Sequence, residues 1–305
     1  MNKFHKKLLL ATLFITIISM MRGQDYTDII RLNISQANLE DTEQTFDTDI
    51  TNINFEILYP KILNENLILL SGLTVEYTDL NLFSFQASEQ LIMSRINAGL
   101  KIKHSEKWSG TYVVLPKLAS SFANIDSKDI QIGGVVLFDY QYKPTVKTKF
   151  GLYSSSENFG VIFTPLFGTF YRSPNKKFHV DAVLPIRLEA NYILTNHFSA
   201  GIDVRNSVKS YNISSRDTNL YVQEESVRAA IYGSYGLLDN ALLLRVKLGF
   251  DSTDYGVYAS NDTVGAQILT FAIGGDDRER LNNEFDSNVF VGLDLIYRFD
   301  TSDRQ

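Results

Sequence analysis

One pattern constrains this chain more than any other: apolar side chains alternate with polar or small ones along most of its length. The alternation is clearest over 95–103, 186–194, 198–209 and 241–251. Successive side chains of a β-strand point to opposite faces, so each segment would present one apolar face and one small or charged face. The best helical candidate, 86–97, also fits a loop that leads into a strand. The pattern therefore predicts an all-β chain.

Short polar breaks separate the alternating segments and are typical of hairpin turns. They lie at 64–66, 105–107, 143–145, 173–175, 195–197 and 238–240. We expect twelve strands, at 48–59, 67–79, 91–104, 107–118, 130–142, 147–155, 161–172, 178–194, 198–211, 220–236, 241–258 and 285–299.

A count of fourteen strands is the alternative. It adds Tyr26 to Ala37 as a first strand and divides 178–194 at Pro185, which cannot donate a hydrogen bond to a ladder. Fourteen strands would place every short turn on one side of the sheet, as membrane barrels do, whereas twelve would not. The alternative also requires an abrupt turn at Pro185.

Alternation alone fits both a soluble β-sandwich and a membrane barrel, which differ in whether the apolar face points to a core or to lipid. Many alternating segments run for ten or more residues, which matches the ~9–11 tilted residues that cross a bilayer. Aromatic side chains also gather near the predicted strand ends, as at Trp108, Tyr142, Tyr192 and Tyr235, and such girdles mark membrane interfaces. We therefore expect one closed antiparallel transmembrane β-barrel.

The C-terminal segment supports this fold. Apolar side chains alternate from Val289 to Phe299, and the last strand ends in Tyr297-Arg298-Phe299. This ending looks like the signal by which the barrel assembly machinery recognises its substrates, so we expect Tyr297 and Phe299 to contact that machinery. The polar tail 300–305 departs from the usual pattern, in which the aromatic residue is the last one.

The N-terminus predicts export. Lys3, Lys6 and Lys7 precede an apolar run at 8–20, and Gly23 precedes Gln24, which is the order of a cleaved signal peptide. An uncleaved anchor is the alternative, although the run falls short of the ~20 residues of a spanning helix. The domain order is then signal peptide 1–23, an N-terminal segment 24–47 with room for an extra strand, and a barrel over 48–299.

Charge and cysteine content exclude several classes of protein. The chain has 29 basic and 35 acidic residues, and cleavage after residue 23 removes four basic residues and no acidic one, leaving a formal charge of −10. This balance disfavours a nucleic-acid partner. The chain has no cysteine, which excludes disulfides, thiolate metal sites and lipid attachment through an N-terminal cysteine.

Several short motifs resemble a family of Gram-negative outer-membrane barrels known as a domain of unknown function. They are Ser105-Glu106-Lys107-Trp108, Asn158-Phe159-Gly160, the run from Thr164 to Tyr171, Asn175-Lys176-Lys177, Leu184-Pro185 and Asn191-Tyr192. The resemblance covers 48–299. It implies a barrel in the outer membrane, with lipid as its surroundings, and it implies no activity.

The sequence offers no catalytic constellation. Of the three histidines after residue 23, His104 and His197 lie in predicted turns, and no HExxH motif or phosphate loop occurs. We therefore expect neither an enzyme nor a cofactor. The acidic cluster at 276–280, with Glu284 and Asp286, has the oxygen ligands for a divalent cation, although a solvated extracellular loop is the simpler explanation.

Charged side chains on the polar faces are the most informative candidates for function, because these faces would line the lumen. The candidates are Arg187, Glu189, Asp203, Arg205, Arg245, Lys247, Asp294 and Arg298. We expect the first four to form a polar ladder on paired strands and the last four a second patch beside the closing strand. Three functions stay open: a channel for small solutes, a structural barrel with a filled lumen, and a membrane-embedded hydrolase. Neither the solute nor the oligomeric state follows from the sequence.

Overall fold

The protein is a β-barrel in the computed structural model, which describes residues 26–43, 47–84, 88–122, 125–213 and 218–300. The expected signal peptide and residues 301–305 lie outside this part of the chain. Consecutive strands pair antiparallel around the wall, and the last strand pairs with both β13 and β1, which closes the cylinder. The prediction of a single closed antiparallel barrel is confirmed.

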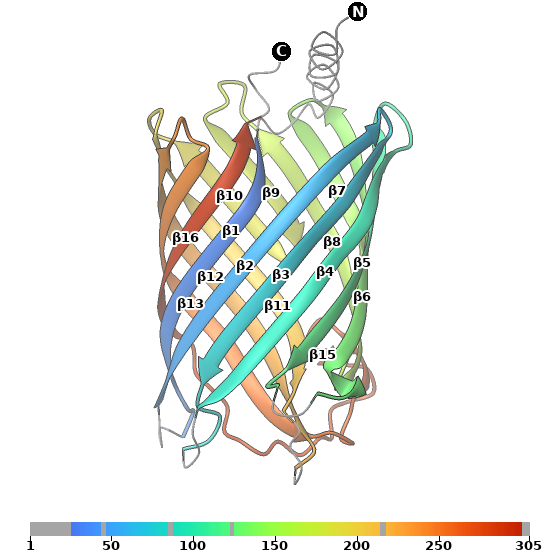
Figure 1. Cartoon of the computed structure of the whole chain (residues 1–305), viewed down its shortest axis with the longest axis vertical. Coiled ribbons are helices and arrows are strands. Elements are labelled where there is room, and N and C mark those ends of the chain that lie inside the picture. Colours follow the sequence, from blue (N-terminus) through green and yellow to red (C-terminus); the bar gives the residue numbers. More distant parts are fainter. Residues whose placement is uncertain (1–25, 44–46, 85–87, 123–124, 214–217, 301–305) are drawn as a thin grey trace, which may run out of the picture.

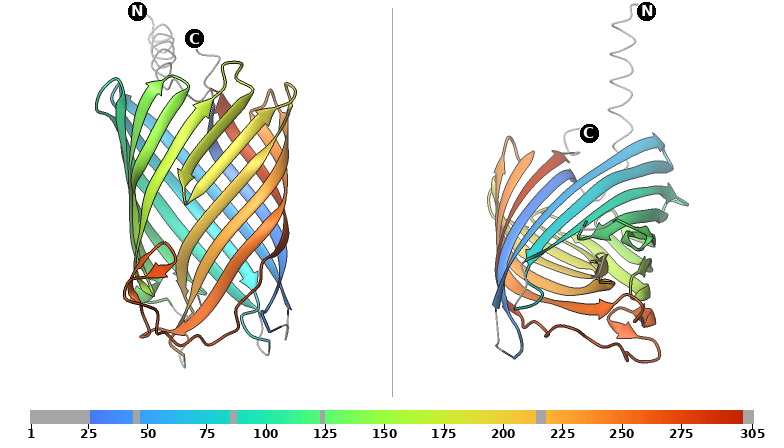
Figure 2. Two further views of the ribbon diagram at one scale, coloured as in Figure 1. Left: turned by 180° about the vertical axis from the view of Figure 1, so that it is seen from behind. Right: turned by 60° about the horizontal axis from the view of Figure 1, so that its bottom comes forward.

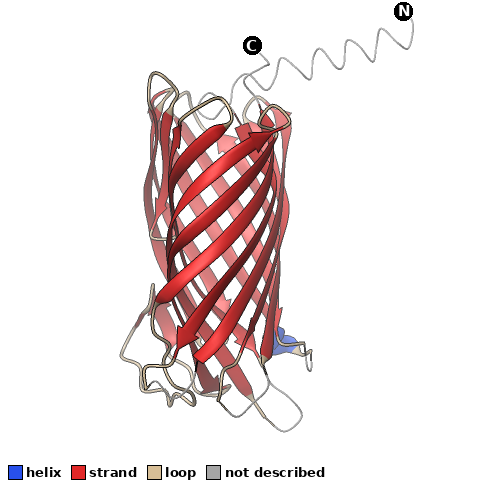
Figure 3. Cartoon of the chain, turned by 90° about the vertical axis from the view of Figure 1, so that its left-hand side faces the viewer, coloured by secondary structure: helices blue, strands red, loops and turns tan. Residues whose placement is uncertain are grey.

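Sixteen strands form one sheet, and all but two of them, β14 and β15, make up the wall. The wall strands are β1 (Tyr26–Glu40), β2 (Asp47–Asn64), β3 (Leu67–Leu80), β4 (Glu89–Lys103), β5 (Trp108–Ser120), β6 (Ile130–Lys143), β7 (Val146–Glu157), β8 (Gly160–Arg172), β9 (Phe178–Leu184), β10 (Arg187–Ile193), β11 (Phe198–Asn212), β12 (Leu220–Leu237), β13 (Leu242–Ala259) and β16 (Asn288–Asp300). Strands β14 (Gly265–Ile268) and β15 (Phe271–Ala272) belong to the loop before β16, and a 3₁₀ turn, Ser127–Asp129, precedes β6 (Figure 3).

The expected count of twelve strands is wrong, and the alternative of fourteen holds. The segment around Tyr26–Glu40 pairs along its length with β16 and β2, so it is a full member of the wall. The chain also turns at Pro185 and Ile186, because Pro185 has no N–H to continue a ladder. What looked like one long strand at 178–194 is thus the short hairpin β9–β10.

The two ends of the barrel differ in their connections. One end of the barrel, called here the turn end, holds all six predicted short turns (Figure 1). The first residue of the wall, Tyr26, and the last, Asp300, also lie there. Connections at the other end, the loop end, include the longest segment between wall strands, 260–287. Short turns belong to the periplasmic side of such barrels and longer loops to the outside.

The outer surface is apolar and the interior is charged, which is the reverse of a soluble protein. On the apolar faces of β11, β13 and β16, the side chains of Ile202, Leu244, Val246, Leu248, Leu293 and Leu295 are exposed, and that of Val204 is half-buried. Their neighbours on the opposite face, such as Asp203, Arg245 and Asp294, are buried. At the turn end, Trp108 packs against Tyr140 and Phe150 with ring centroids 4.8 and 5.8 Å apart. An apolar band with an aromatic girdle identifies an outer-membrane barrel.

At the loop end, parts of β11, β12 and β13 are buried on both faces. Ser210, Tyr211 and Asn212 are all buried although they alternate in direction. Asn212 pairs with Ser120 of β5, which is not a neighbour of β11 in the wall, so β11 bends across the interior. Tyr211 joins a buried apolar cluster with Leu39, from β1. This inward-bent region fills the loop end of the lumen.

No helix in the described residues has the length and apolar character to span a membrane.

Candidate functional site

The predicted polar ladder lies on the inner face of β10 and β11, but its charges pair differently from the expectation. The register places Arg187 opposite Arg205 and Glu189 opposite Asp203, so like charges face each other across the two strands. Such pairs are unfavourable unless other groups compensate them. Arg205 instead binds Asp203 on its own strand, at 3.0 Å from Nη2 to Oδ2. Arg187 reaches Asp181 on β9, at 2.8 Å.

Glu189 of β10 forms its ion pair with a residue of β13, across β11 and β12. Arg245 of β13 donates to Glu189 Oε1 at 2.9 Å, and its guanidinium lies 3.9 Å from the ring centroid of Tyr232. The Tyr232 hydroxyl also donates to Glu189, at 3.2 Å. Arg245 is almost fully buried, so its charge depends on these contacts. A cation from β13 thereby stabilises an anion on β10.

Lys247 joins the two expected groups into one network. Its Nζ lies 2.9 Å from Asp294 Oδ2 and 3.4 Å from Asp203 Oδ1. Asn33 of β1 donates a further hydrogen bond to Asp294. Arg298 lies apart from this network and pairs with Asp28 of β1, at 3.1 Å. Arg245, Lys247 and Asp294 thus lie together on β13 and β16, whereas Arg298 pairs toward β1.

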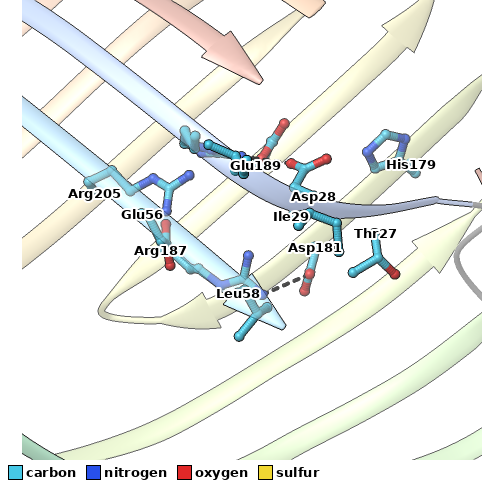
Figure 4. A pocket seen from close by; sticks show the side chains of 12 residues that line it. Thr27, Asp28, Ile29, Glu56, Leu58, His179, Asp181, Arg187, Glu189 and Arg205 are labelled. Atoms are coloured by element: carbon cyan, nitrogen blue, oxygen red, sulfur yellow. Dashed lines mark hydrogen bonds and ion pairs between the residues drawn. The ribbon is translucent and has the colours of Figure 1, made fainter. Parts of the chain in front are cut away.

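A cavity of about 330 Å³ lies inside the barrel toward the turn end (Figure 4). Arg187, Glu189 and Arg205 line one side, and Asp28 and Glu56 of β1 and β2 line the other. Strands β1 and β2 are not wall neighbours of β10 and β11, so this turn-end cavity spans the lumen. Sequence reasoning did not select Arg31, Glu56 or Asp181, although each alternates with apolar neighbours. It also missed Asp28, which follows Thr27 and precedes a register shift, so alternation could not place it.

A second cavity, of about 260 Å³, lies toward the loop end. Glu76, Arg95, Lys117 and Lys209 line it together with apolar side chains. Lys209 bridges Glu76 and Glu224, and Lys117 Nζ lies 2.6 Å from Glu157 Oε1. Sequence reasoning placed Lys209 on a polar face but did not select Glu76, Lys117 or Glu157. Arg205 lines the turn-end cavity and Asn206 lines this loop-end cavity, so the two cavities follow one another along β11.

Comparison with known families decides the classification. A family model described as a domain of unknown function, DUF6268, matches residues 35–259. The chain belongs to the DUF6268 family. The recognition of such a barrel family from the sequence is confirmed. The matched part of this DUF6268 protein includes both cavity-lining strands β10 and β11, whereas Asp294 and Arg298 lie beyond it.

Several solved structures are similar to this DUF6268 protein at low sequence identity. The COG4313 outer membrane channel from Pseudomonas putida F1 has 9% identity and a TM-score of 0.46, covering 91% of this chain and 96% of that one. The Pseudomonas putida toluene transporter TodX has 12% identity and a TM-score of 0.38, covering 95% and 93%. The NanC porin has 7% identity and a TM-score of 0.35, covering 88% and 98%. No curated protein matches the chain.

The turn histidine and the acidic loop segment, which the sequence also singled out in this DUF6268 protein, form hydrogen bonds and ion pairs within the chain. At the turn end, His104 Nε2 lies 3.0 Å from the Tyr112 hydroxyl. In the acidic loop segment, Arg278 binds Asp276 at 2.7 Å, and this hydrogen bond from the guanidinium lowers the pKa of the Asp276 carboxyl. Arg280 binds Asp254 at 2.5 Å. Among the described residues, no group of three or more His, Asp or Glu is arranged to hold a metal ion.

Proposed function

We propose that the protein is a narrow channel for small solutes in the outer membrane. The observation that carries this proposal is the pair of cavities that follow one another along β11, one in each half of the lumen. A barrel that served only as a scaffold would gain stability from filling this space with packed side chains. The lumen instead keeps space lined by charged groups, which is the arrangement by which pores accommodate polar solutes.

The charges that line the cavities are of both signs, and most of them are paired. In the turn-end cavity, Arg187 and Arg205 face Asp28, Glu56 and Asp181. Paired charges of both signs would admit cations and anions without a strong bias. The bound pairs also narrow the path, so we expect a small unit conductance rather than that of a wide porin.

A structural barrel with a filled lumen is the second candidate, because one observation favours it. The inward-bent region at the loop end buries Tyr211, Val222 and Tyr255 among apolar side chains of β1 to β4. This apolar packing obstructs a straight exit along the barrel axis. The two candidates differ in whether solutes cross the barrel at all.

Planar-bilayer recordings of the purified barrel would separate the two. We expect small, steady unit currents from the wild type. Arg205→Ala should shift ion selectivity toward cations, because it removes a positive charge from the turn-end cavity while Lys247 still binds Asp203. Lys107→Ala, in an exposed turn that lines neither cavity, is the control and should leave selectivity unchanged. A folded wild-type barrel without currents would contradict the proposed channel.

A further inference from the structure

The barrel wall is interrupted on the side where the short hairpin β9–β10 lies (Figure 2). Strand β8 pairs with β9 only over 167–172 and with β14 only over 160–163, which leaves 164–166 without a strand partner on that side. Strand β11 pairs with β10 only over 199–205. Between β8 and β11, the loop-end half of the wall thus lacks the two strands that separate them elsewhere.

This wall gap has four sides. They are 164–166 of β8, the turn at Pro185 and Ile186, 207–209 of β11, and the turn at Leu269 and Thr270 between β14 and β15. The last side is held in place by two links, since β14 pairs in parallel with β8 and the N–H of Leu269 donates to Phe163 O at 3.1 Å.

The loop-end cavity extends from this gap into the lumen. Its lining includes residues from all four sides of the gap, Thr164, Pro185, Ser207 and Leu269 among them. It also includes Glu76 and Arg95, which project from β3 and β4 on another part of the wall. A single cavity therefore connects the interruption in the wall with the interior.

The gap lies at the depth of the lipid. Thr164 is seven residues along β8 from Tyr171 at the turn end, which is roughly 18 Å at ~3.3 Å per residue and a tilt of about 40°. This distance is inside an apolar band of about 25 Å. The side chains that surround the gap on the outer surface are apolar and exposed, as at Phe163, Phe167, Leu184 and Phe271. Lipid acyl chains would therefore contact its rim.

The lining of the loop-end cavity indicates the kind of molecule that fits. Much of it is apolar, including Leu115, Val135 and Ile162, and its volume of about 260 Å³ is near the lower limit for small-molecule sites. Lys117 and Lys209 bind carboxylates. Arg95, by contrast, donates only long hydrogen bonds, to Asn97 Oδ1 at 3.3 Å and Thr74 Oγ1 at 3.4 Å, and forms no ion pair within the described residues. A cation without a bound carboxylate beside an apolar surface suits an acid with an apolar tail.

We propose that small amphipathic acids pass between the loop-end cavity and the outer leaflet through the wall gap, with Arg95 binding the acid group. The proposal rests on the proposed channel and names its substrate class. It also gives the channel an exit that avoids the inward-bent region. The molecule would leave sideways into lipid, where its apolar tail is more stable than in water.

Single-cysteine labelling in lipid vesicles tests the route, because the chain has no cysteine of its own. Ser207→Cys lies on the gap, and Thr27→Cys, which lines the turn-end cavity, is its matched control. The measured quantity is the labelling rate by pyrenyl maleimide dissolved in the bilayer, divided by the rate with a charged, water-soluble maleimide. We expect this ratio to be at least tenfold higher for Ser207→Cys than for Thr27→Cys. Equal ratios would overturn the lateral route.

Protection by ligand tests the substrate class. Octanoate should slow the bilayer labelling of Ser207→Cys at least threefold, octanol should slow it less, and neither should affect Val246→Cys on the lipid face. Adding Arg95→Gln should remove the advantage of octanoate over octanol. Equal protection by the two probes before that change would overturn the role of Arg95, and no protection would overturn the binding of amphipathic acids.

These results are distinguishable from a failure of the channel itself. Unit currents together with an unlabelled Ser207→Cys would overturn the lateral route and leave the channel intact. Protected labelling in a barrel without currents would support the gap and contradict the channel that conducts ions along the lumen.

Discussion

The turn-end and loop-end halves of the lumen are built from the same alternating strands but hold different interiors. In the turn-end half, charged side chains from opposite walls surround a cavity, and every wall strand has a neighbour on both sides. In the loop-end half, β11 bends inward while it stays paired with β12, apolar side chains such as Tyr211 fill the centre, and the wall has a gap. The half in which the hairpin β9–β10 is cut short is thus also the half in which β11 bends inward, and there the proposed exit is lateral rather than axial.

The largest expected effect breaks the loop-end packing. Tyr211 is fully buried and its hydroxyl donates to Glu224 at 3.3 Å. Tyr211→Ala should lower the free energy of unfolding by about 3–5 kcal/mol, because it removes a large side chain from a packed cluster. It should also raise the unit conductance by opening the axial exit. Urea refolding in detergent micelles and bilayer recordings measure the two effects.

Tyr211→Phe is the matched control, because it keeps the ring and removes only the hydroxyl. Its conductance should equal that of the wild type. A Tyr211→Ala barrel with wild-type conductance would show that the apolar cluster does not obstruct the path, and the contrast between the two halves would lose its functional meaning.

The next effect tests the outer surface, which both halves share. Val246 is exposed on β13 four residues from the turn-end limit of this strand at Leu242, which is roughly 10 Å at ~3.3 Å per residue and a tilt of about 40°, near the middle of the apolar band. Val246→Arg should therefore lower the free energy of unfolding by roughly 2–4 kcal/mol in lipid vesicles. Leu237→Arg, at the turn-end limit of β12, should cost only about 0–1 kcal/mol, because interfacial water solvates the guanidinium. Equal losses of unfolding free energy at Val246 and Leu237 would contradict the position assigned to the apolar band on the barrel.

A smaller effect is expected in the turn-end cavity. Arg187 is partly exposed there and binds Asp181, which also binds Lys149. Arg187→Ala should therefore cost only about 0–1 kcal/mol in equilibrium unfolding, since Asp181 keeps a partner. A loss comparable with that of Tyr211→Ala would show that the turn-end half is packed as tightly as the loop-end half.

The smallest effect concerns the acidic stretch at 276–280 in the long loop 260–287. The hydrogen bond from Arg278 lowers the pKa of Asp276, so this contact stabilises the loop at and above the ordinary carboxyl pKa of about 3.9. The stabilisation is lost as the pH falls through the lowered value. Pepsin cleavage within 260–287 should accelerate over that window in the wild type, and the acceleration should be weaker in Asp276→Asn. Identical profiles would contradict the linkage.

The sequence was sufficient to predict which faces of the strands are charged but not which charges meet. Alternation identifies Glu189 and Arg245 as members of the polar faces, yet their contact spans β10 to β13 and depends on the closure and curvature of the barrel. The same limit explains the strand count, because a hairpin as short as β9–β10 resembles one strand until its pairing is known. The burial of Tyr211 and Val222 could not be predicted either, because alternation gives no sign that a strand is buried on both faces. Recognition of Tyr297 and Phe299 by the assembly machinery stays a prediction.

The parallel pair between β14 and β8 has a consequence for biogenesis. The edge of β8 at 160–163 is covered by β14, which follows five wall strands later in the chain, so a wall that assembles before the last loop docks leaves these backbone groups without a partner. Unpaired strand edges recruit other chains. A barrel whose last loop has not docked would therefore present an edge that can pair with another chain, and the docking of β14 protects this edge.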